Sequence, residues 1–209
     1  MRKAPRPHIK RNNQAERSDM HARLILPLLF LVPAVASAAE TIDPTRIVSA
    51  ATGDWNKDGD ADLALIVRPA DGSDDDNGVY LYLTGENGAL ELKAAIPNKI
   101  WGDFDFAGQA PWVEALPSGS LLISSHNDSI GRDRWEQKLT VAYRNFEFVV
   151  AGYTYSSYDT LDLDNTLKCD LNVLTGKGKS NDKAIATKGE LVLLKDWNDD
   201  RGQKACGVQ

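Results

Sequence analysis

Histidine is scarce in this chain of 209 residues, and His126 is the one histidine that follows residue 38. A transition-metal site built from several histidines is therefore excluded from residues 39–209. His126 lies in the run Ser124-Ser125-His126-Asn127-Asp128, which contains the residue types of a serine-protease triad. Adjacent residues of an extended chain point to opposite faces, so we interpret His126 as a polar loop residue.

Catalytic motifs are also missing. The sequence contains no Gly-x-Ser-x-Gly nucleophile elbow and no phosphate-binding P-loop, and its two cysteines are too far apart for a Cys-x-x-Cys redox site. A glycosidase needs only a pair of carboxylates, so a periplasmic glycan hydrolase stays as an alternative to a protein without catalysis. Its candidate acids, and the tyrosines that would line a sugar groove, are Asp159, Asp162, Asp164, Tyr153, Tyr155 and Tyr158.

The apolar run at residues 24–35 is too short to span a bilayer comfortably. Basic residues precede it and Ala36-Ser37-Ala38 follows it, which predicts a secretory signal peptide cleaved after Ala38. Met20 would be a normal first residue for this signal, so residues 20–38 form the predicted signal peptide. Residues 1–19 are interpreted as an extension that comes from a start codon placed too far upstream. An uncleaved anchor is the alternative. No cysteine stands at the cleavage point, so a lipoprotein anchor is not supported.

Positive charge is in short supply once the predicted leader, residues 1–38, is set aside. The full chain has 24 Lys and Arg against 30 Asp and Glu, and residues 39–209 keep 17 basic and 28 acidic side chains, a net charge of −11. A chain this acidic repels nucleic acid and anionic membranes, so we expect neither as a partner. This acidic balance suits cation binding or simple solubility.

Cysteine occurs twice, as Cys169 and Cys206. An even count in an exported chain predicts one disulfide, because compartments outside the cytoplasm are oxidising. This bridge would tie the C-terminus to the body of the domain. The alternative is two free buried thiols.

Residues 39–209 are expected to form a single β-rich domain. They show no long amphipathic helical pattern, and their short apolar runs between Gly, Pro, Asn and Asp predict strands. The strongest hairpin pairs residues 138–143 with 146–151 across Arg144-Asn145. We predict an all-β, mainly antiparallel fold, either a compact sandwich or a few blade-like sheets, because too few strands are visible for a closed propeller. The other predicted strands are 63–67, 79–83, 90–93, 120–125, 153–158 and 190–195.

The stretch Asp54-Trp55-Asn56-Lys57-Asp58-Gly59-Asp60-Ala61-Asp62 concentrates oxygen donors within nine residues. Ca²⁺ takes roughly six to eight oxygen ligands, and a loop with acids at alternate positions can fold around one ion. Without an ion, four Asp side chains this close would repel one another, so the spacing predicts a calcium site rather than a metal-free turn. The predicted ligands, at alternate positions of the loop, are Asp54, Asn56, Asp58, Asp60 through its carbonyl, and Asp62.

Leu65 stands where an EF-hand would have its closing Glu, and residues 63–67 predict a strand instead of a helix. The motif Gly-Asp-Trp-Asn-x-Asp-Gly-x-x-Asp-Leu resembles the calcium loop of FG-GAP and VCBS repeats, which occur in integrin-type propellers and in many secreted bacterial proteins. The resemblance covers about one repeat, residues 48–67. It implies a calcium-stabilised β unit with a structural ion, and it implies no reaction.

Three further acidic stretches are weaker candidates for a second ion. Residues 103–108 keep acids at their first and third positions but have Ala107 at the fifth. Residues 196–200 repeat Asp-Trp-Asn-x-Asp, with Arg201 in place of the turn glycine. Residues 71–78 have suitable ligand types at unsuitable spacing, so we interpret them as a solvated loop.

These observations predict an exported calcium-binding β-domain, periplasmic or secreted, that binds a protein or an envelope glycan without catalysis. The alternatives are the glycan hydrolase and an enzyme-inhibitor protein. We expect no stable membrane anchor after signal cleavage. The tryptophans are interpreted as core or loop packing, although side chains exposed together would make a platform for a carbohydrate or protein; they are Trp55, Trp101, Trp112, Trp135 and Trp197.

Overall fold

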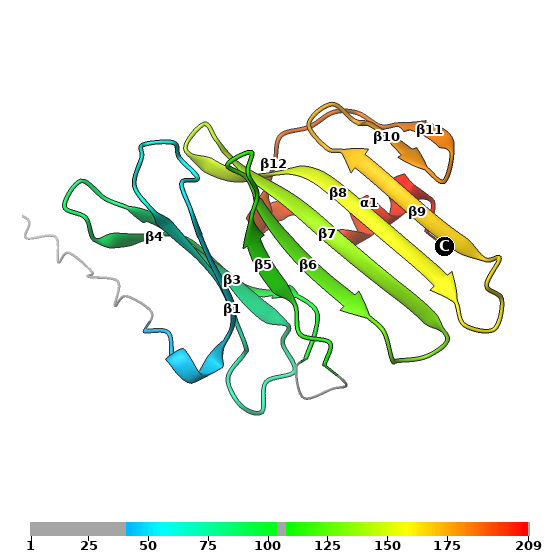
Figure 1. Cartoon of the computed structure of the whole chain (residues 1–209), viewed down its shortest axis with the longest axis horizontal. Helices are drawn as coiled ribbons and strands as arrows, with labels where there is room; N and C mark the ends of the chain where they lie inside the picture. Colours follow the sequence, from blue (N-terminus) through cyan, green and yellow to red (C-terminus); the bar gives the residue numbers. More distant parts are fainter. Residues whose placement is uncertain (1–40, 104–107, 209) are drawn as a thin grey trace, which may run out of the picture. The chain divides into compact units, whose positions relative to one another are not determined.

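The computed structural model describes residues 41–103 and 108–208. Most of the elements in these residues are β-strands (Figure 1). The predicted leader at residues 1–38 lies outside the described residues. Within them, the strands form two sheets, and every pairing is antiparallel. The prediction of an all-β, mainly antiparallel fold is confirmed.

The first sheet is a meander in the order β1-β2-β3-β4. Its strands are β1 (Ile47–Gly53), β2 (Asp62–Val67), β3 (Asn77–Thr84) and β4 (Leu90–Ile100). The second sheet continues as a meander from β5 to β11. Its strands are β5 (Trp112–Ala115), β6 (Leu121–Asn127), β7 (Asp133–Arg144), β8 (Glu147–Asp159), β9 (Thr166–Asn172), β10 (Lys177–Ser180) and β11 (Lys183–Ala186).

The strand predicted at residues 190–195 is mostly wrong. Only β12 (Val192–Leu193) is extended, and the 3₁₀ helix η2 (Leu194–Asp196) follows at once. β9 pairs with β8 from Gly152 onwards, and β12 pairs with Val149 and Val150, which come earlier on β8. A second 3₁₀ helix, η1 (Pro44–Arg46), precedes β1.

The predicted hairpin at residues 138–151 is confirmed as β7 and β8, with its turn one residue later than expected. Asn145 and Phe146 have φ angles of 51° and 64°, which places both in the left-handed region. Paired left-handed residues are typical of the tight turns that match the twist of a hairpin. Phe146 is 80% exposed at this tip.

One core holds residues from both sheets. Ile66 and Leu81 of the first sheet belong to the same buried cluster as Ile123 and Val141 of the second. Because side chains alternate along a strand, the other face of the first sheet carries a smaller cluster around Leu65. Two packed sheets with a shared core are consistent with a sandwich.

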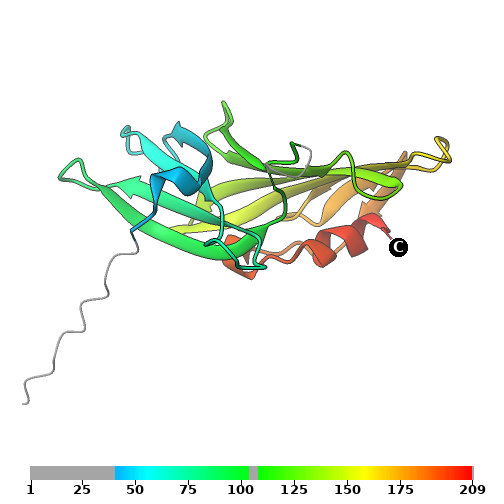
Figure 2. The ribbon, with the colours of Figure 1, turned by 90° about the horizontal axis from the view of Figure 1, so that it is seen from below.

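The chain ends in α1 (Asp199–Cys206), which Figure 2 shows against one face of the second sheet. The Asn198 side chain accepts a hydrogen bond from the Asp200 N–H at 2.8 Å, which caps the first turn. Gly207, at φ 79°, ends the helix in the left-handed conformation.

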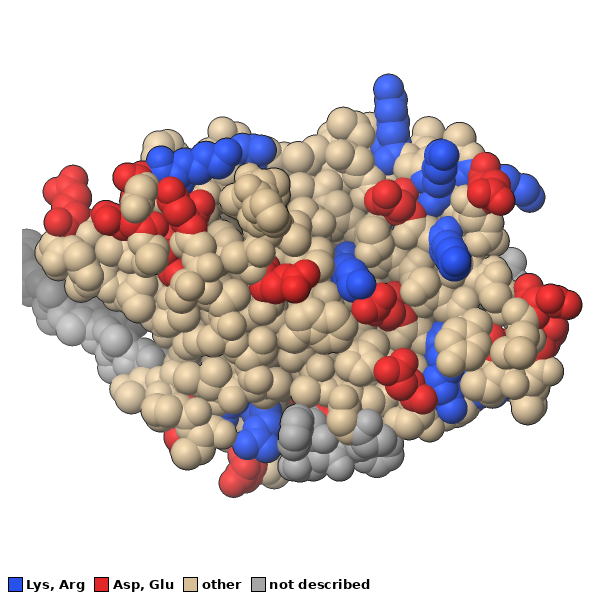
Figure 3. Space-filling view, in the orientation of Figure 1, with Lys and Arg blue, Asp and Glu red and all other residues tan. Residues whose placement is uncertain are grey.

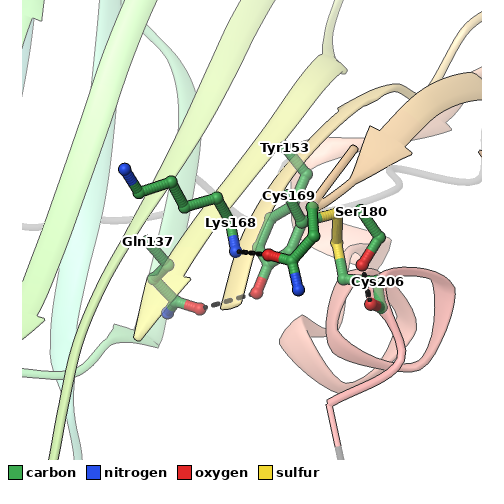
Figure 4. Close-up of a disulfide and its surroundings, with 7 residues drawn as sticks. Gln137, Tyr153, Lys168, Cys169, Ser180 and Cys206 are labelled. Carbon is green, nitrogen blue, oxygen red and sulfur yellow. Dashed lines mark hydrogen bonds between the residues drawn. A yellow bond between two sulfur atoms is a disulfide. The ribbon is translucent and has the colours of Figure 1, made fainter. Parts of the chain in front are cut away.

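A disulfide joins β9 to α1, as predicted. Cys169 and Cys206 are bonded, with their Cα atoms 5.6 Å apart. The Ser180 hydroxyl donates to the Cys206 carbonyl at 2.6 Å, so β10 also holds the end of the helix (Figure 4).

On the face of the second sheet opposite α1, basic and acidic side chains are interspersed (Figure 3). Lys138 and Glu136, both on β7, form an ion pair at 3.0 Å. This mixture of signs gives no support to a nucleic-acid surface, which would need clustered Lys and Arg.

Candidate metal site

The candidate calcium loop connects β1 to β2. Gly53 and Asp62 pair at the base of this hairpin, so the loop runs directly into a strand, as the sequence predicts. Trp55 is 2% exposed and belongs to the shared core. A Cβ atom added to Gly53 would lie 2.4 Å from the Trp55 ring. Glycine at this position therefore lets the indole fold back and anchor the start of the loop.

The first predicted ligands converge on one short piece of backbone. Asp54 accepts hydrogen bonds from the N–H groups of Asp58 and Gly59, each at 3.1 Å. The Asn56 side-chain oxygen accepts from the same Asp58 N–H at 3.2 Å. Lys57 and Gly59 have φ angles of 67° and 97°, which bend the chain around these oxygens.

Asp58 is the third side chain in this group. Its carboxylate accepts from the Asp60 N–H at 2.9 Å and from the Asn56 amide at 2.6 Å. The hydrogen bond from the Asp60 backbone, followed by that from Asn56, lowers the pKa of Asp58 below its usual value. These hydrogen bonds therefore favour the ionised form of Asp58.

Asp62 has a structural position that the ligand pattern did not predict. It is fully buried, and its two oxygens accept from the Trp55 N–H at 2.8 Å and the Thr84 N–H at 2.9 Å. The Thr84 hydroxyl also donates to the Ala61 carbonyl at 2.6 Å. Asp62 thus ties both ends of the loop to β3, and this role depends on strand register rather than on spacing within the loop.

The donors of the loop fit a hard cation in kind. Asp54, Asn56 and Asp58 offer only carboxylate and amide oxygens, which are the ligands that Ca²⁺ takes. In the described residues, no three or more His, Cys, Asp and Glu side chains are gathered as a metal centre. The loop oxygens point instead to backbone N–H groups, and Asp60 is exposed.

Two of the weaker acidic stretches have other partners. In residues 71–78, the Asp76 N–H donates to Asn98 at 2.8 Å, and burial, followed by the charges of Asp199 and Asp75, raises the pKa of Asp76. This stretch lines a hollow of 440 Å³ that also contains Arg46. Residues 104–107, within the stretch 103–108, lie outside the described residues.

The stretch 196–200 starts a helix instead of forming a loop like the first. Asn198 caps α1, and Asp199 accepts from the Trp197 indole at 3.0 Å and from Gln137 at 2.6 Å. Arg201, which stands in place of the turn glycine, forms an ion pair with Glu190.

The candidate hydrolase residues do not form a groove of paired acids. Asp159 accepts hydrogen bonds from the Arg132 guanidinium and from the Leu161 N–H at 2.8 Å. Tyr153 is buried and donates to Gln137 at 3.2 Å (Figure 4), and burial raises the pKa of its hydroxyl. Tyr155 is also buried, whereas Tyr158, Asp162 and Asp164 are exposed.

Asp159 therefore has a structural role that predicts acid sensitivity. The Arg132 guanidinium is the main cause that lowers the pKa of Asp159 below its usual value. A carboxylate with a depressed folded-state pKa stabilises the fold at pH values above its unfolded pKa of about 4, and the stabilisation is lost as pH falls through the lower folded value. We expect Asp159→Asn to reduce stability at neutral pH and to flatten the acid limb of the unfolding profile. Urea unfolding between about pH 2 and 7 measures this, and an unchanged acid limb would contradict it.

His126 lies within β6, so its interpretation as a loop residue is wrong. Its Nε2 atom is 3.5 Å from a carboxylate oxygen of Asp128, and its ring meets Trp112 edge-on at 5.5 Å. Ser125 accepts instead from Gln137 at 3.2 Å. The run 124–128 is therefore divided between the two faces of the sheet.

Comparison with protein-family models, curated proteins and solved structures finds no match to this chain.

Proposed function

We propose that this chain is an exported β-domain in which a calcium ion stabilises the β1–β2 loop, and that the domain binds a partner without catalysis. The observation that carries the proposal is the convergence of Asp54 and Asn56 on the Asp58 N–H. Asp62 holds the two ends of the loop together, so the turn is organised before an ion arrives. Preorganised oxygen donors favour a permanent structural ion over a sensor.

The disulfide supports a location outside the cytoplasm. Structural disulfides persist in oxidising compartments such as the periplasm and the extracellular space, and the Cys169–Cys206 bridge lies in the protein interior, with Cys206 2% exposed. None of the helices in the described residues has the length and apolar character needed to cross a membrane. A periplasmic or secreted location agrees with the predicted signal peptide.

The environment of Asp159 favours binding over glycan hydrolysis. A glycosidase needs one carboxyl group whose pKa is raised so that it can donate a proton. The pKa of Asp159 is instead lowered by its ion pair with Arg132. Asp159 is therefore not suited to be that proton donor.

Chelation tests the calcium part of this proposal. At a calcium concentration of about 100 times Kd, a bound ion adds about 2.7 kcal/mol to the free energy of unfolding. For a domain of this size, we expect EDTA to lower the melting temperature by about 5–10 °C relative to calcium-loaded protein. Calorimetry measures the shift. Asp58→Ala is the matched control, because its melting temperature should not respond to EDTA. An unchanged melting temperature of the parent protein in EDTA would reject the calcium ion.

A further inference from the structure

A hollow of 680 Å³ lies at the end of the second sheet where β7 starts, β8 ends and β9 starts. Its volume falls within the range of about 300–1,000 Å³ that is usual for small-ligand sites. Residues of the β6–β7 loop and of the β8–β9 loop line it, together with Gly207 at the C-terminal end of α1. The hollow shares no lining residue with the β1–β2 loop, so it is a separate site.

Aromatic side chains form part of its wall. Trp135 on β7 and Tyr155 on β8 lie in neighbouring strands and both line the hollow. The Trp135 ring is braced from one side by Trp101, with their centroids 5.1 Å apart. Trp135 pairs with Ser157 and Tyr155 pairs with Gln137, so both rings lie on the same face of the sheet, whereas Tyr158 pairs with Arg134 and points to the other face. Rigid rings of this kind offer flat apolar surfaces at a low cost in side-chain entropy.

Polar groups face the same hollow. Arg132 and Asp159 are fixed to each other by paired hydrogen bonds, and Thr160 ties its loop to the Arg132 carbonyl at 2.9 Å through its N–H and its hydroxyl. Asp133 and Asn165 are exposed residues of the lining. The hollow therefore combines flat aromatic rings with planar carboxylate, amide and guanidinium groups. Hydrogen bonds hold the loops that carry these polar groups.

A sugar ring has matching chemistry, because one face presents C–H groups and the rim presents adjacent hydroxyls. The C–H face packs on an aromatic ring, and a planar carboxylate or amide can bond to two neighbouring hydroxyls. The net charge of the lining residues narrows the class of sugar further. Asp159 neutralises Arg132, which leaves the carboxylate of Asp133 as the remaining charge, so an acidic sugar would be repelled.

We propose that this hollow binds a short neutral oligosaccharide through Trp135 and Asp133. The proposal rests on the partner-binding part of the proposed function and does not depend on the calcium loop. It gives the predicted glycan partner a site, which includes Tyr155 and Asp159 of the groove that the sequence indicated but not Asp162 or Asp164.

The test is a titration of the disulfide-bonded protein with four trisaccharides: N-acetylated chitotriose, cellotriose, maltotriose and trigalacturonate. Calorimetry and tryptophan fluorescence follow binding up to about 10 mM sugar. We expect saturable binding of at least one neutral trisaccharide, with a change in tryptophan emission. Which neutral sugar binds distinguishes an amino-sugar polymer of the envelope from a plain glucan.

Variants locate the binding site. Asp133→Ala and Trp135→Ala should each weaken binding by about tenfold or more. Asp164→Ala is the matched control, because Asp164 is an exposed acid in the β8–β9 loop and does not line the hollow. Melting curves confirm that each variant is folded. Trp135→Phe keeps a flat ring and should weaken binding less than Trp135→Ala.

Three results would overturn the proposal: no neutral trisaccharide binds, only trigalacturonate binds, or binding is unaffected by both Asp133→Ala and Trp135→Ala. Chelator-sensitive melting is measured on the same samples. A protein that melts earlier in EDTA but binds no sugar would remove the saccharide site and keep the calcium loop.

Discussion

Replacing Asp62 with Ala is expected to destabilise the domain by about 3–5 kcal/mol, because the substitution leaves two N–H groups without their charged acceptor at a buried position. Asp62 is fully buried, and its oxygens accept from Trp55 and Thr84. A charge-assisted hydrogen bond contributes about 1.5–3 kcal/mol, and a buried donor without a partner costs a similar amount. Urea unfolding measures the loss.

Two matched variants separate this effect from calcium binding. Asp60→Ala removes an exposed acid from the same loop and should change stability by about 0.5 kcal/mol or less. Asp62→Asn keeps one acceptor oxygen and should fall between the parent and Asp62→Ala. Because the hydrogen bonds of Asp62 need no ion, the loss in Asp62→Ala should persist in EDTA. A loss that disappears in EDTA would mean that Asp62 acts only as a calcium ligand.

Removing the disulfide should cost about 4 kcal/mol on the chain-entropy model. Cys169 and Cys206 are 37 residues apart in sequence, so the bridge restricts a long loop of the unfolded chain. It also holds α1 against β9, where Ser180 donates to the Cys206 carbonyl. The double substitution Cys169→Ala with Cys206→Ala, compared with the oxidised parent in urea, measures this contribution.

Ser180→Ala is the control for the disulfide. It removes the hydrogen bond to Cys206 but leaves the bridge, so we expect a loss of about 1 kcal/mol. If the double cysteine variant loses no more than Ser180→Ala, the bridge does not restrict the unfolded chain as this model assumes.

Local patterns predicted the elements that depend on near neighbours in sequence. The apolar run at residues 63–67 became β2, and the spacing from Asp54 to Asp58 placed these side chains over one turn. Some strands were missed because their composition is atypical. β10 contains only Lys, Gly and Ser, and β11 is only four residues long, so neither shows a clear alternating pattern.

Features that depend on pairing between distant segments were not predictable in this way. The hydrogen bond from Thr84 to Asp62 requires the register of β2 with β3. The hollow beside Trp135 collects residues from three separate segments. The start of α1 is an exception, because it has a local signal. Asn198 followed by Asp199 and Asp200 is a typical helix start.

The most direct test of the central claim is a calorimetric titration of metal-free protein with CaCl₂. We predict saturable binding of one ion, loss of binding in Asp54→Ala and in Asp58→Ala, and nearly unchanged affinity in Asp60→Asn, because Asp60 is expected to contribute only its carbonyl. Absence of binding by the parent protein, or binding that survives both Asp54→Ala and Asp58→Ala, would contradict a calcium-stabilised β1–β2 loop.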